Sequence, residues 1–170
     1  VQRGRVLDDD EIRSFCNNAD NASLHPLTVI ALCLVLITGQ RPDDLTGMHV
    51  DEINGSTWTI PAARRSKSNN VHCVPLCSLA LQLIAAAKTE KDRLSNRRSK
   101  PQSGYLFEAR PGGPISNATL GKAISRAAPP LEIKHVEPWG RWTPHELRTT
   151  MRTGLSAYRI APHIAELAIG

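Results

Sequence analysis

The chain has 170 residues, of which 41% are apolar and 22% charged, a length that suffices for one globular domain with a buried core. Its longest apolar run, residues 27–37, is far shorter than the about 20 residues of a membrane span, and the N-terminus lacks the pattern of a signal peptide. Twenty-one Lys and Arg against sixteen Asp and Glu give a net charge of +5, which weakly favours a polyanionic partner. We therefore expect a cytoplasmic protein without membrane association.

The four cysteines indicate neither a disulfide framework nor a metal site. Cys16 and Cys33 fall in apolar helical patterns and are expected to be small core residues. His72, Cys73 and Cys77 are close in sequence, but zinc sites usually pair one C-x-x-C with a second such pair, which is missing here. We predict no metal site, and the scattered thiols suit a reducing compartment.

The first part of the chain predicts three helices. An acidic run at residues 8–11 precedes apolar residues at helical spacing and predicts a helix that starts with acids. Residues 27–37 are apolar on nearly all sides and predict a central buried helix. After a break, Pro42 and the two acids that follow it predict a short helix through Met48.

After this helix the pattern changes to that of strands. Asn54-Gly55 predicts a tight turn, residues 57–60 a strand, and residues 71–76 a second strand. Residues 64–70 would form a polar tip between these two strands. Together they predict a small antiparallel sheet of about three strands, and His72 is expected on its surface.

The remainder of the chain returns to helical patterns. Residues 78–89 predict a helix, whereas residues 91–103 are basic, rich in serine and poor in apolar residues, and predict an exposed loop. Further helices are predicted at 116–127, 144–158 and 162–168, with an irregular segment at 129–142 whose Trp139 and Trp142 are expected in the core. The predicted fold is α+β, mainly helical, with one small sheet.

The clearest local signal lies in residues 143–148, which read T-P-H-E-L-R. Thr143 and Glu146 have the spacing of a capping box, and the proline between them stands at its favoured first helical position. His145 therefore lies in the first turn of a helix, where free backbone N–H groups attract an anion, and Arg148 shares its face. An imidazole and a guanidinium side by side suit a phosphate. The alternative is an ordinary capped helix that carries these two residues by chance.

Two further basic residues have special positions. Arg41 follows a buried helix and a glycine and precedes Pro42, so its backbone is pushed away from helix and its side chain is held rigidly. It could clamp a ligand or only form an ion pair with Asp43 or Asp44. Lys67 lies in the polar tip of the hairpin, where it could enter a nucleic-acid groove and donate a proton, or only be solvated.

The order of these features resembles the catalytic domain of tyrosine recombinases, the phage integrase family. The chain reads T-G-Q-R-P-D-D-L after the buried helix, I-P-A and H-C-V-P-L around the basic hairpin, and then T-P-H-E-L-R-T-T. The resemblance covers essentially the whole chain, from R-V-L-D-D-D-E-I onward, and is strongest to integrases of prophages and integrative elements. It implies the fold of DNA breaking-rejoining enzymes and a role in site-specific recombination or integration of double-stranded DNA.

The resemblance also implies roles for four residues, because Arg41, Lys67, His145 and Arg148 match the family's catalytic positions. The two arginines would hold the scissile phosphate and stabilise its transition-state charge. His145 would assist proton transfer at the nucleophile, and Lys67 would protonate the departing 5′-hydroxyl. A tyrosine attacks the phosphorus and forms a 3′-phosphotyrosyl intermediate. The family uses no metal and no cofactor, and it implies self-association of the full-length protein on DNA.

The chain departs from the family's pattern at two points. Asp44 stands where the family usually has Glu. Residues 167–170 read L-A-I-G and stop at the glycine of the family's leucine-glycine-histidine segment, before the histidine and the nucleophilic tyrosine. We expect residues 1–170 to be one catalytic domain, truncated before the nucleophile, inactive by itself and without the N-terminal DNA-binding domain. Neither Tyr105 nor Tyr158 is expected to be the nucleophile, and Tyr158 matches a packing position.

Two other functions stay open at this point. A recombinase-like domain without catalysis could serve as a DNA-binding or regulatory module, although four intact basic positions argue against it. A type IB topoisomerase shares the chemistry and relaxes supercoils without site preference. The T-G-Q-R and T-P-H-E-L-R motifs are more similar to those of integrases.

Overall fold

The computed structural model describes residues 4–19, 22–65, 69–98, 103–110, 112–131, 133 and 142–170. Its α-helices are α1 (Asp9–Asn18), α2 (Pro26–Thr38), α3 (Pro42–Thr46), α4 (Ser78–Arg98), α5 (Asn117–Leu131), α6 (Pro144–Ala157) and α7 (Pro162–Ile169). Two short 3-10 helices are η1 (Val50–Glu52) and η2 (Ala62–Arg64). Over these described ranges, none of the helices combines the length and apolar content that a membrane crossing requires.

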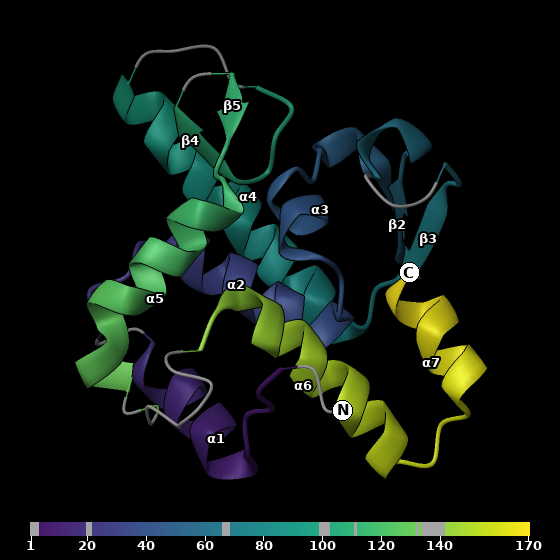
Figure 1. The fold of residues 1–170 in the computed structure, drawn as a ribbon. Coiled ribbons are helices and arrows are strands. Elements are labelled where there is room, and N and C mark those ends of the chain that lie inside the picture. Colours follow the sequence, from purple (N-terminus) through teal and green to yellow (C-terminus); the bar gives the residue numbers. More distant parts are fainter. Residues whose placement is uncertain are drawn as a thin grey trace.

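The strands form two antiparallel sheets. One has the order β1 (Ile53–Asn54), β2 (Thr57–Ile60), β3 (His72–Pro75), and the other pairs β4 (Glu108–Arg110) with β5 (Gly113–Pro114). Figure 1 shows the three-stranded sheet at the side of the helical body and the β4–β5 pair near one end of α4. The predicted mainly helical fold with a small three-stranded sheet is therefore confirmed, and the β4–β5 pair is an addition to it.

Helix α2 is the central helix of the domain (Figure 1). Its side chains at Ala31, Leu32, Leu34 and Val35 have no exposed surface. Helices α4 and α6 make the most extensive contacts with it, and α3 and α5 also touch it. A helix that is apolar on all sides is stable in water only when neighbours cover it, so the predicted central buried helix is confirmed.

Helix α1 begins as its acidic residues predict. Asp8 Oδ1 accepts a hydrogen bond from the Glu11 backbone N–H at 2.8 Å, and the Glu11 carboxylate accepts one from the Asp8 backbone N–H at 3.2 Å. Further along the helix, Phe15 is fully buried and meets Trp142 edge to face, with ring centroids 5.7 Å apart. Trp142 therefore lies in the core, as predicted, and joins the segment before α6 to α1.

Strand β2 pairs with both of its neighbours, and the alternation of side chains decides which residues face the core. Trp58 lies opposite Val74, and Ile60 lies opposite His72. Because successive strand residues point to opposite faces, His72 shares the inward face of Val74 and is only 9% exposed. The predicted position of His72 on the sheet surface is therefore wrong.

Helix α4 is longer than predicted. The exposed loop expected over residues 91–103 is wrong for residues 91–98, because the helix continues to Arg98, and residues 99–102 lie outside the described residues. Lys91 is only 5% exposed, and its ammonium group donates a hydrogen bond to the Ser103 carbonyl oxygen. Leu94, in the next turn, is partly buried against the core. Inward contacts by Lys91 and Leu94 hold this polar part of the helix on the domain. Because the segment contains few apolar residues, its composition did not indicate these contacts.

Four smaller predictions also need correction. Helix α3 ends at Thr46 instead of Met48, and α5 continues into the predicted irregular segment as far as Leu131, which is fully buried. Cys16 is exposed instead of buried, because Phe15 already faces the core and adjacent helical residues point in different directions. Tyr158 is 83% exposed and does not have the packing position predicted for it.

Candidate functional site

The turn between α2 and α3 positions Arg41. Gly39 ends α2 with φ +65°, and a Cβ there would lie 2.8 Å from Cγ2 of Ile169 and 3.0 Å from Cγ of Met151. Only glycine allows this left-handed backbone and the close approach of α6 and α7. Arg41 then caps α3 in an extended conformation, as expected for the residue before Pro42. Its backbone is therefore fixed from both sides.

Arg41 forms an ion pair with Asp44, one turn further along. Arg41 Nη1 lies 3.9 Å from Asp44 Oδ2, and Asp44 is only 5% exposed. Burial raises the pKa of Asp44, whereas the positive charges of Arg41, Arg64, Arg65 and Arg148 act in the opposite direction. Asp44 is thus a shared negative charge among several guanidinium groups. The ion pair considered for Arg41 is present, and it leaves 28% of the Arg41 side chain exposed.

Arg148, on the second turn of α6, is oriented by three backbone carbonyl groups. Its Nη1 donates to the Gly39 oxygen at 2.7 Å and to the Ile169 oxygen at 2.6 Å, and its Nη2 donates to the Gly170 oxygen at 3.2 Å. A guanidinium has five N–H donors. Three of these donors bind the carbonyl groups, which leaves the Nε–H and one Nη2–H without a hydrogen bond over the described ranges. Two such donors suit two oxygens of an anion.

Arg41 and Arg148 are close enough for their charges to interact. Burial lowers the pKa of Arg148 to about 10, the charge of Arg41 lowers it as well, and Asp44 opposes both effects. The guanidinium therefore stays charged at neutral pH, at an energetic cost that an anion would relieve. We name this corner, formed by Arg41, Asp44 and Arg148, the arginine corner.

His145 lies next to Arg148 along the same helix. The Glu146 carboxylate accepts a hydrogen bond from the Thr143 backbone N–H at 2.6 Å, so the predicted capping box is present at the start of α6. His145 stands in the first turn and is exposed. A spacing of three residues puts it on the face of Arg148, although within the described chain no contact joins its ring to either arginine. Its catalytic role stays a prediction.

Lys67 lies outside the described residues, and its role also stays a prediction. The two arginines before it do not belong to a solvated tip. Arg64 donates to the Gly47 oxygen and, through Nη2, to Glu52 Oε2 at 2.7 Å. Arg65 is 9% exposed and donates through Nη1 to the Asn70 oxygen at 3.1 Å. The prediction of a polar tip is therefore wrong for these first two residues.

Three residues that were not predicted as site residues also border the arginine corner. Gln40 is 1% exposed and its Nε2 donates to the Ala168 oxygen at 2.9 Å, while Arg65 and His72 approach from the sheet. The alternation with Val74 could have placed His72 on the buried face, since Val74 is a clear core residue. No local pattern signals the burial of Arg65, because a charged run usually indicates a solvated turn.

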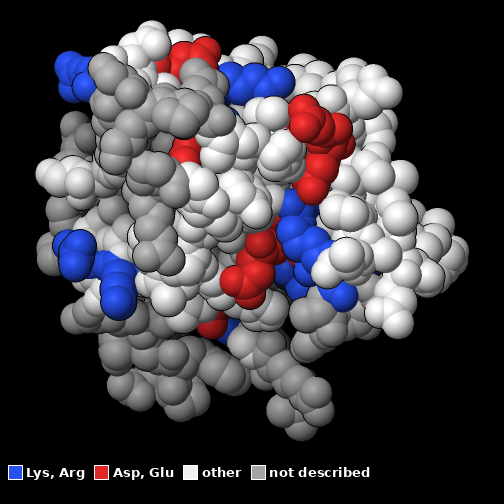
Figure 2. All heavy atoms as spheres, turned by 90° about the horizontal axis from the view of Figure 1, so that it is seen from above, with Lys and Arg blue, Asp and Glu red and all other residues white. Residues whose placement is uncertain are grey.

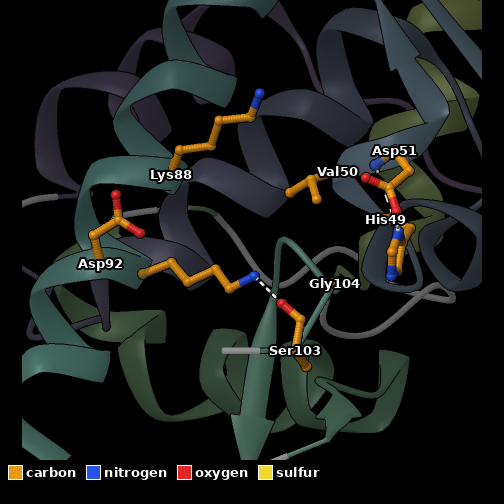
Figure 3. A pocket seen from close by; sticks show the side chains of 8 residues that line it. His49, Val50, Asp51, Lys88, Asp92, Ser103 and Gly104 are labelled. Atoms are coloured by element: carbon orange, nitrogen blue, oxygen red, sulfur yellow. Dashed lines mark hydrogen bonds and ion pairs between the residues drawn. The ribbon is translucent and has the colours of Figure 1, made fainter. Parts of the chain in front are cut away.

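A separate hollow of about 580 Å³ lies between α4 and η1 (Figure 3). It is lined by His49, Val50, Asp51, Lys88, Lys91, Asp92, Ser103 and Gly104. The figure shows Lys88 and Asp92 on the α4 side and His49 and Asp51 on the other side. Charges of both signs line the hollow, and the Lys91 ammonium is already bonded to Ser103. This lining is less suited to a phosphate than the arginine corner.

The net charge does not form one broad basic surface on the face shown in Figure 2. Among the atoms coloured there, Lys and Arg groups alternate with Asp and Glu groups. A surface of mixed sign attracts a polyanion less than a continuous basic patch does. On this face the overall excess of +5 is therefore a poorer guide to function than the local gathering of arginines.

Comparison with known families agrees with the geometry. The model of the phage integrase family matches residues 5–169. The chain belongs to the phage integrase family. The tyrosine-recombinase resemblance that its motifs suggested is thereby confirmed, and with it a family whose members break and rejoin DNA. A comparison with curated proteins finds no match.

Solved structures of integrases and recombinases share the fold. The XerH recombinase bound to its difH substrate is 19% identical with a TM-score of 0.74, and the match covers 97% of this chain and 46% of that one. The Tn1549 transposon integrase in complex with transposon right-end DNA is 17% identical with a TM-score of 0.77, and the match covers 99% and 58%. A lambda integrase dimer bound to a core site is 23% identical with a TM-score of 0.68, and the match covers 100% of this chain and 58% of that one. This phage integrase chain spans about half the length of these structural relatives.

Proposed function

We propose that this chain is the catalytic domain of a site-specific tyrosine recombinase, an integrase or excision enzyme of a phage or mobile element that cuts and rejoins double-stranded DNA. The observation that carries the proposal is the guanidinium of Arg148, held by three carbonyl groups within electrostatic range of Arg41, with two N–H donors left unbonded among the described residues. A phosphodiester offers two non-bridging oxygens, which match two such donors.

The arginine corner is suited to the transition state of phosphoryl transfer. Negative charge builds up on the non-bridging oxygens when a nucleophile attacks phosphorus, and donors that are already oriented stabilise it without reorganisation. Arg148 is oriented by the carbonyl groups of Gly39, Ile169 and Gly170, and Arg41 is oriented by Asp44. Both guanidinium groups would therefore bind the scissile phosphate.

The remaining steps require proton transfer and a nucleophile. A tyrosine hydroxyl would lose its proton with the help of His145 and attack the phosphorus, forming a 3′-phosphotyrosyl bond while the bond to the 5′-oxygen breaks. Lys67 would donate the proton that the departing 5′-hydroxyl needs. In this proposal the tyrosine follows Gly170 in a longer polypeptide, so the 170-residue chain alone would bind DNA weakly and would not cleave it.

The proposal also names partners and a location. The substrate is double-stranded DNA, on which several copies of the full-length protein would assemble, with an N-terminal DNA-binding domain before Val1. The DNA complexes of XerH and of the Tn1549 integrase, and the lambda integrase dimer on its core site, support these partners. The protein would act in the cytoplasm, where the DNA of a bacterium or phage is accessible.

The test is covalent trapping with the full-length protein. A duplex site with a nick beside the cleavage position traps the phosphotyrosyl complex, which a denaturing gel separates from free protein. Replacing Arg41 or Arg148 by Ala should lower the trapped fraction by about 10²-fold or more, while a gel shift shows that site binding largely survives. Arg126→Ala, an exposed change on α5, is the matched control. Undiminished trapping by the two corner variants would refute the assignment of the site.

The trapping assay and a relaxation assay on supercoiled DNA together separate the alternatives. A DNA-binding module without catalysis would give no trapped complex even with the unaltered protein. A type IB topoisomerase would relax supercoiled DNA without site preference.

A further inference from the structure

The arginine corner borders a buried guanidinium nitrogen without a partner among the described residues. Arg65 and His72 are each 9% exposed. Nε of Arg65 makes no hydrogen bond within the described chain, whereas the His72 imidazole interacts with the backbone of Ala168. The one hydrogen bond of the Arg65 guanidinium among those residues runs from Nη1 to the Asn70 oxygen at 3.1 Å. Buried polar groups in native proteins nearly always have a partner, so the Arg65 guanidinium points to a ligand.

Both side chains approach the same point. A Cβ built on Gly170 would lie 2.9 Å from Arg65 Nη2 and 2.9 Å from His72 Nε2. The carbonyl oxygen of Gly170 accepts the hydrogen bond from Arg148 Nη2. Figure 1 shows the end of α7 beside β3, the strand that begins with His72. Arg65 therefore lies on the sheet side of the corner whose other side is formed by Arg148.

The charges around this point do not balance. Arg41, Arg65 and Arg148 contribute three positive charges, and Asp44 contributes one negative charge, which leaves an excess of two positive charges. Arg64 also acts on Asp44, but it is neutralised by Glu52 at 2.7 Å. An excess of positive charge on buried and partly buried groups is unfavourable unless an anion compensates it. A phosphate in its transition state carries about the charge that is missing.

A purely structural role for Arg65 has less support. Arg65 acts on the pKa of Asp44, yet no ion pair within 4.0 Å joins the two side chains among the described contacts. His72 does not compete for an anion as a second cation, because burial and the charge of Arg65 lower the pKa of its imidazole. A neutral ring beside the guanidinium fills space without repelling it.

We propose that Arg65 is a third guanidinium of the phosphate site, which donates its free N–H groups to a non-bridging oxygen of the scissile phosphate together with Arg41 and Arg148. This inference rests on the proposed function and adds a residue that the motifs do not indicate. The bonds that form and break are those of the transfer already described, since Arg65 only stabilises charge on the oxygen.

The test compares two substrates in single-turnover cleavage by the full-length protein. One duplex carries the ordinary scissile phosphodiester, and the other carries a methylphosphonate, in which a methyl group replaces one non-bridging oxygen, as each of its two stereoisomers. The variant Arg65→Gln should slow diester cleavage by about 10²-fold. On the stereoisomer that lacks the contacted oxygen, the same variant should slow cleavage only a few-fold, because the contact is already lost.

Controls make the outcomes distinguishable. Arg126→Gln makes the same charge change on the exposed face of α5 and should cleave both substrates like the unaltered protein. Equal slowing of the diester and both stereoisomers by Arg65→Gln would show a merely structural role and overturn the inference. Diester cleavage within about 3-fold of the unaltered protein, well below the loss expected of an oxyanion donor, would also overturn it. Absence of cleavage by the unaltered protein would contradict the proposed function itself.

A second measurement does not need a folded variant. The guanidinium Nε–H signals of the 170-residue chain can be followed by nuclear magnetic resonance during titration with inorganic phosphate, with chloride at equal ionic strength as the control. The Arg65 and Arg148 signals should shift together and saturate at the same phosphate concentration. A shift of the Arg148 signal with a stationary Arg65 signal would overturn the inference and leave the proposed function standing.

Discussion

Asp44 shows how one buried carboxylate organises the arginine corner. Within the described chain it is the acid that acts on both Arg41 and Arg148, and it is 5% exposed. Burial alone would favour its neutral form, and the surrounding guanidinium groups keep the charged form competitive. The side chain is shorter than the glutamate that usually stands there in the family, yet it lies 3.9 Å from Arg41.

Replacing Asp44 by Asn should therefore destabilise the domain. The positive charges of Arg41 and Arg148 would lose their shared counter-charge and repel each other, which should lower the free energy of unfolding by about 1–3 kcal/mol. Urea unfolding measures this loss. Asp43→Asn removes the same charge from the neighbouring exposed position on α3 and should change stability by less than about 0.5 kcal/mol. Equal stability of the two variants would show that Asp44 has no such role.

At the scale of elements, the corner depends on the close approach of three helices. The C-terminal end of α2, the side of α6 and the last turn of α7 meet at Gly39, whose virtual Cβ would touch Ile169 and Met151. The carbonyl of the same glycine orients Arg148. The residue that permits the packing thus also supplies a contact that the candidate site needs.

Replacing Gly39 by Ala should cost stability for two reasons. A left-handed backbone costs a residue with a side chain about 1–2 kcal/mol, and the methyl group would collide with Ile169, 2.8 Å away. We expect a fall in Tm of about 2–8 °C for a domain of this size, measured by thermal unfolding. Gly154→Ala on α6, where no atom lies within 4 Å of the new Cβ, should leave Tm unchanged or raise it. A Gly39→Ala variant that melts like the Gly154→Ala variant would contradict this packing.

The elements that could be predicted are those whose signals are local. The acids before α1, the apolar run of α2 and the capping box of α6 each act within one or two turns, and each predicted element is present. The end of α4 was missed because its stability comes from Lys91 and Leu94, two inward contacts in an otherwise polar segment. Tertiary packing determines how far such a helix extends, and the amino-acid composition of the segment does not indicate that packing.

The residues of the candidate site also fall into those that local motifs could indicate and those that depend on tertiary packing. Arg41 and Arg148 could be named as candidates because each lies near a helix boundary and matches a motif of the family, and their catalytic roles stay predictions. Arg65 was missed, since its burial depends on the end of α7, more than a hundred residues away along the chain. His72 was placed on the wrong face although its alternation with Val74 was available. The order of motifs along the chain could suggest Arg41 and Arg148. Only the folded structure shows that Arg65 and His72 lie next to them.

At the scale of the whole molecule, distant segments converge on one point. The end of α2, the start of β3, the second turn of α6 and the end of α7 all border the arginine corner (Figure 1). Helix α2 provides the common support because α4 and α6 both pack on it. The account therefore depends on a claim about the assembled domain, that Arg41 and Arg148 act on the same phosphate.

The most direct measurement of this claim is a double-mutant cycle on single-turnover cleavage. Arg41→Lys and Arg148→Lys keep the charge and remove the two-donor geometry, so their rates stay measurable in the full-length protein. If both side chains bind one phosphate, the double variant should lose clearly less than the product of the two single losses, because neighbouring groups that act as a unit are not additive. Losses that multiply to the full product would mean that the two arginines act independently, and would contradict the account.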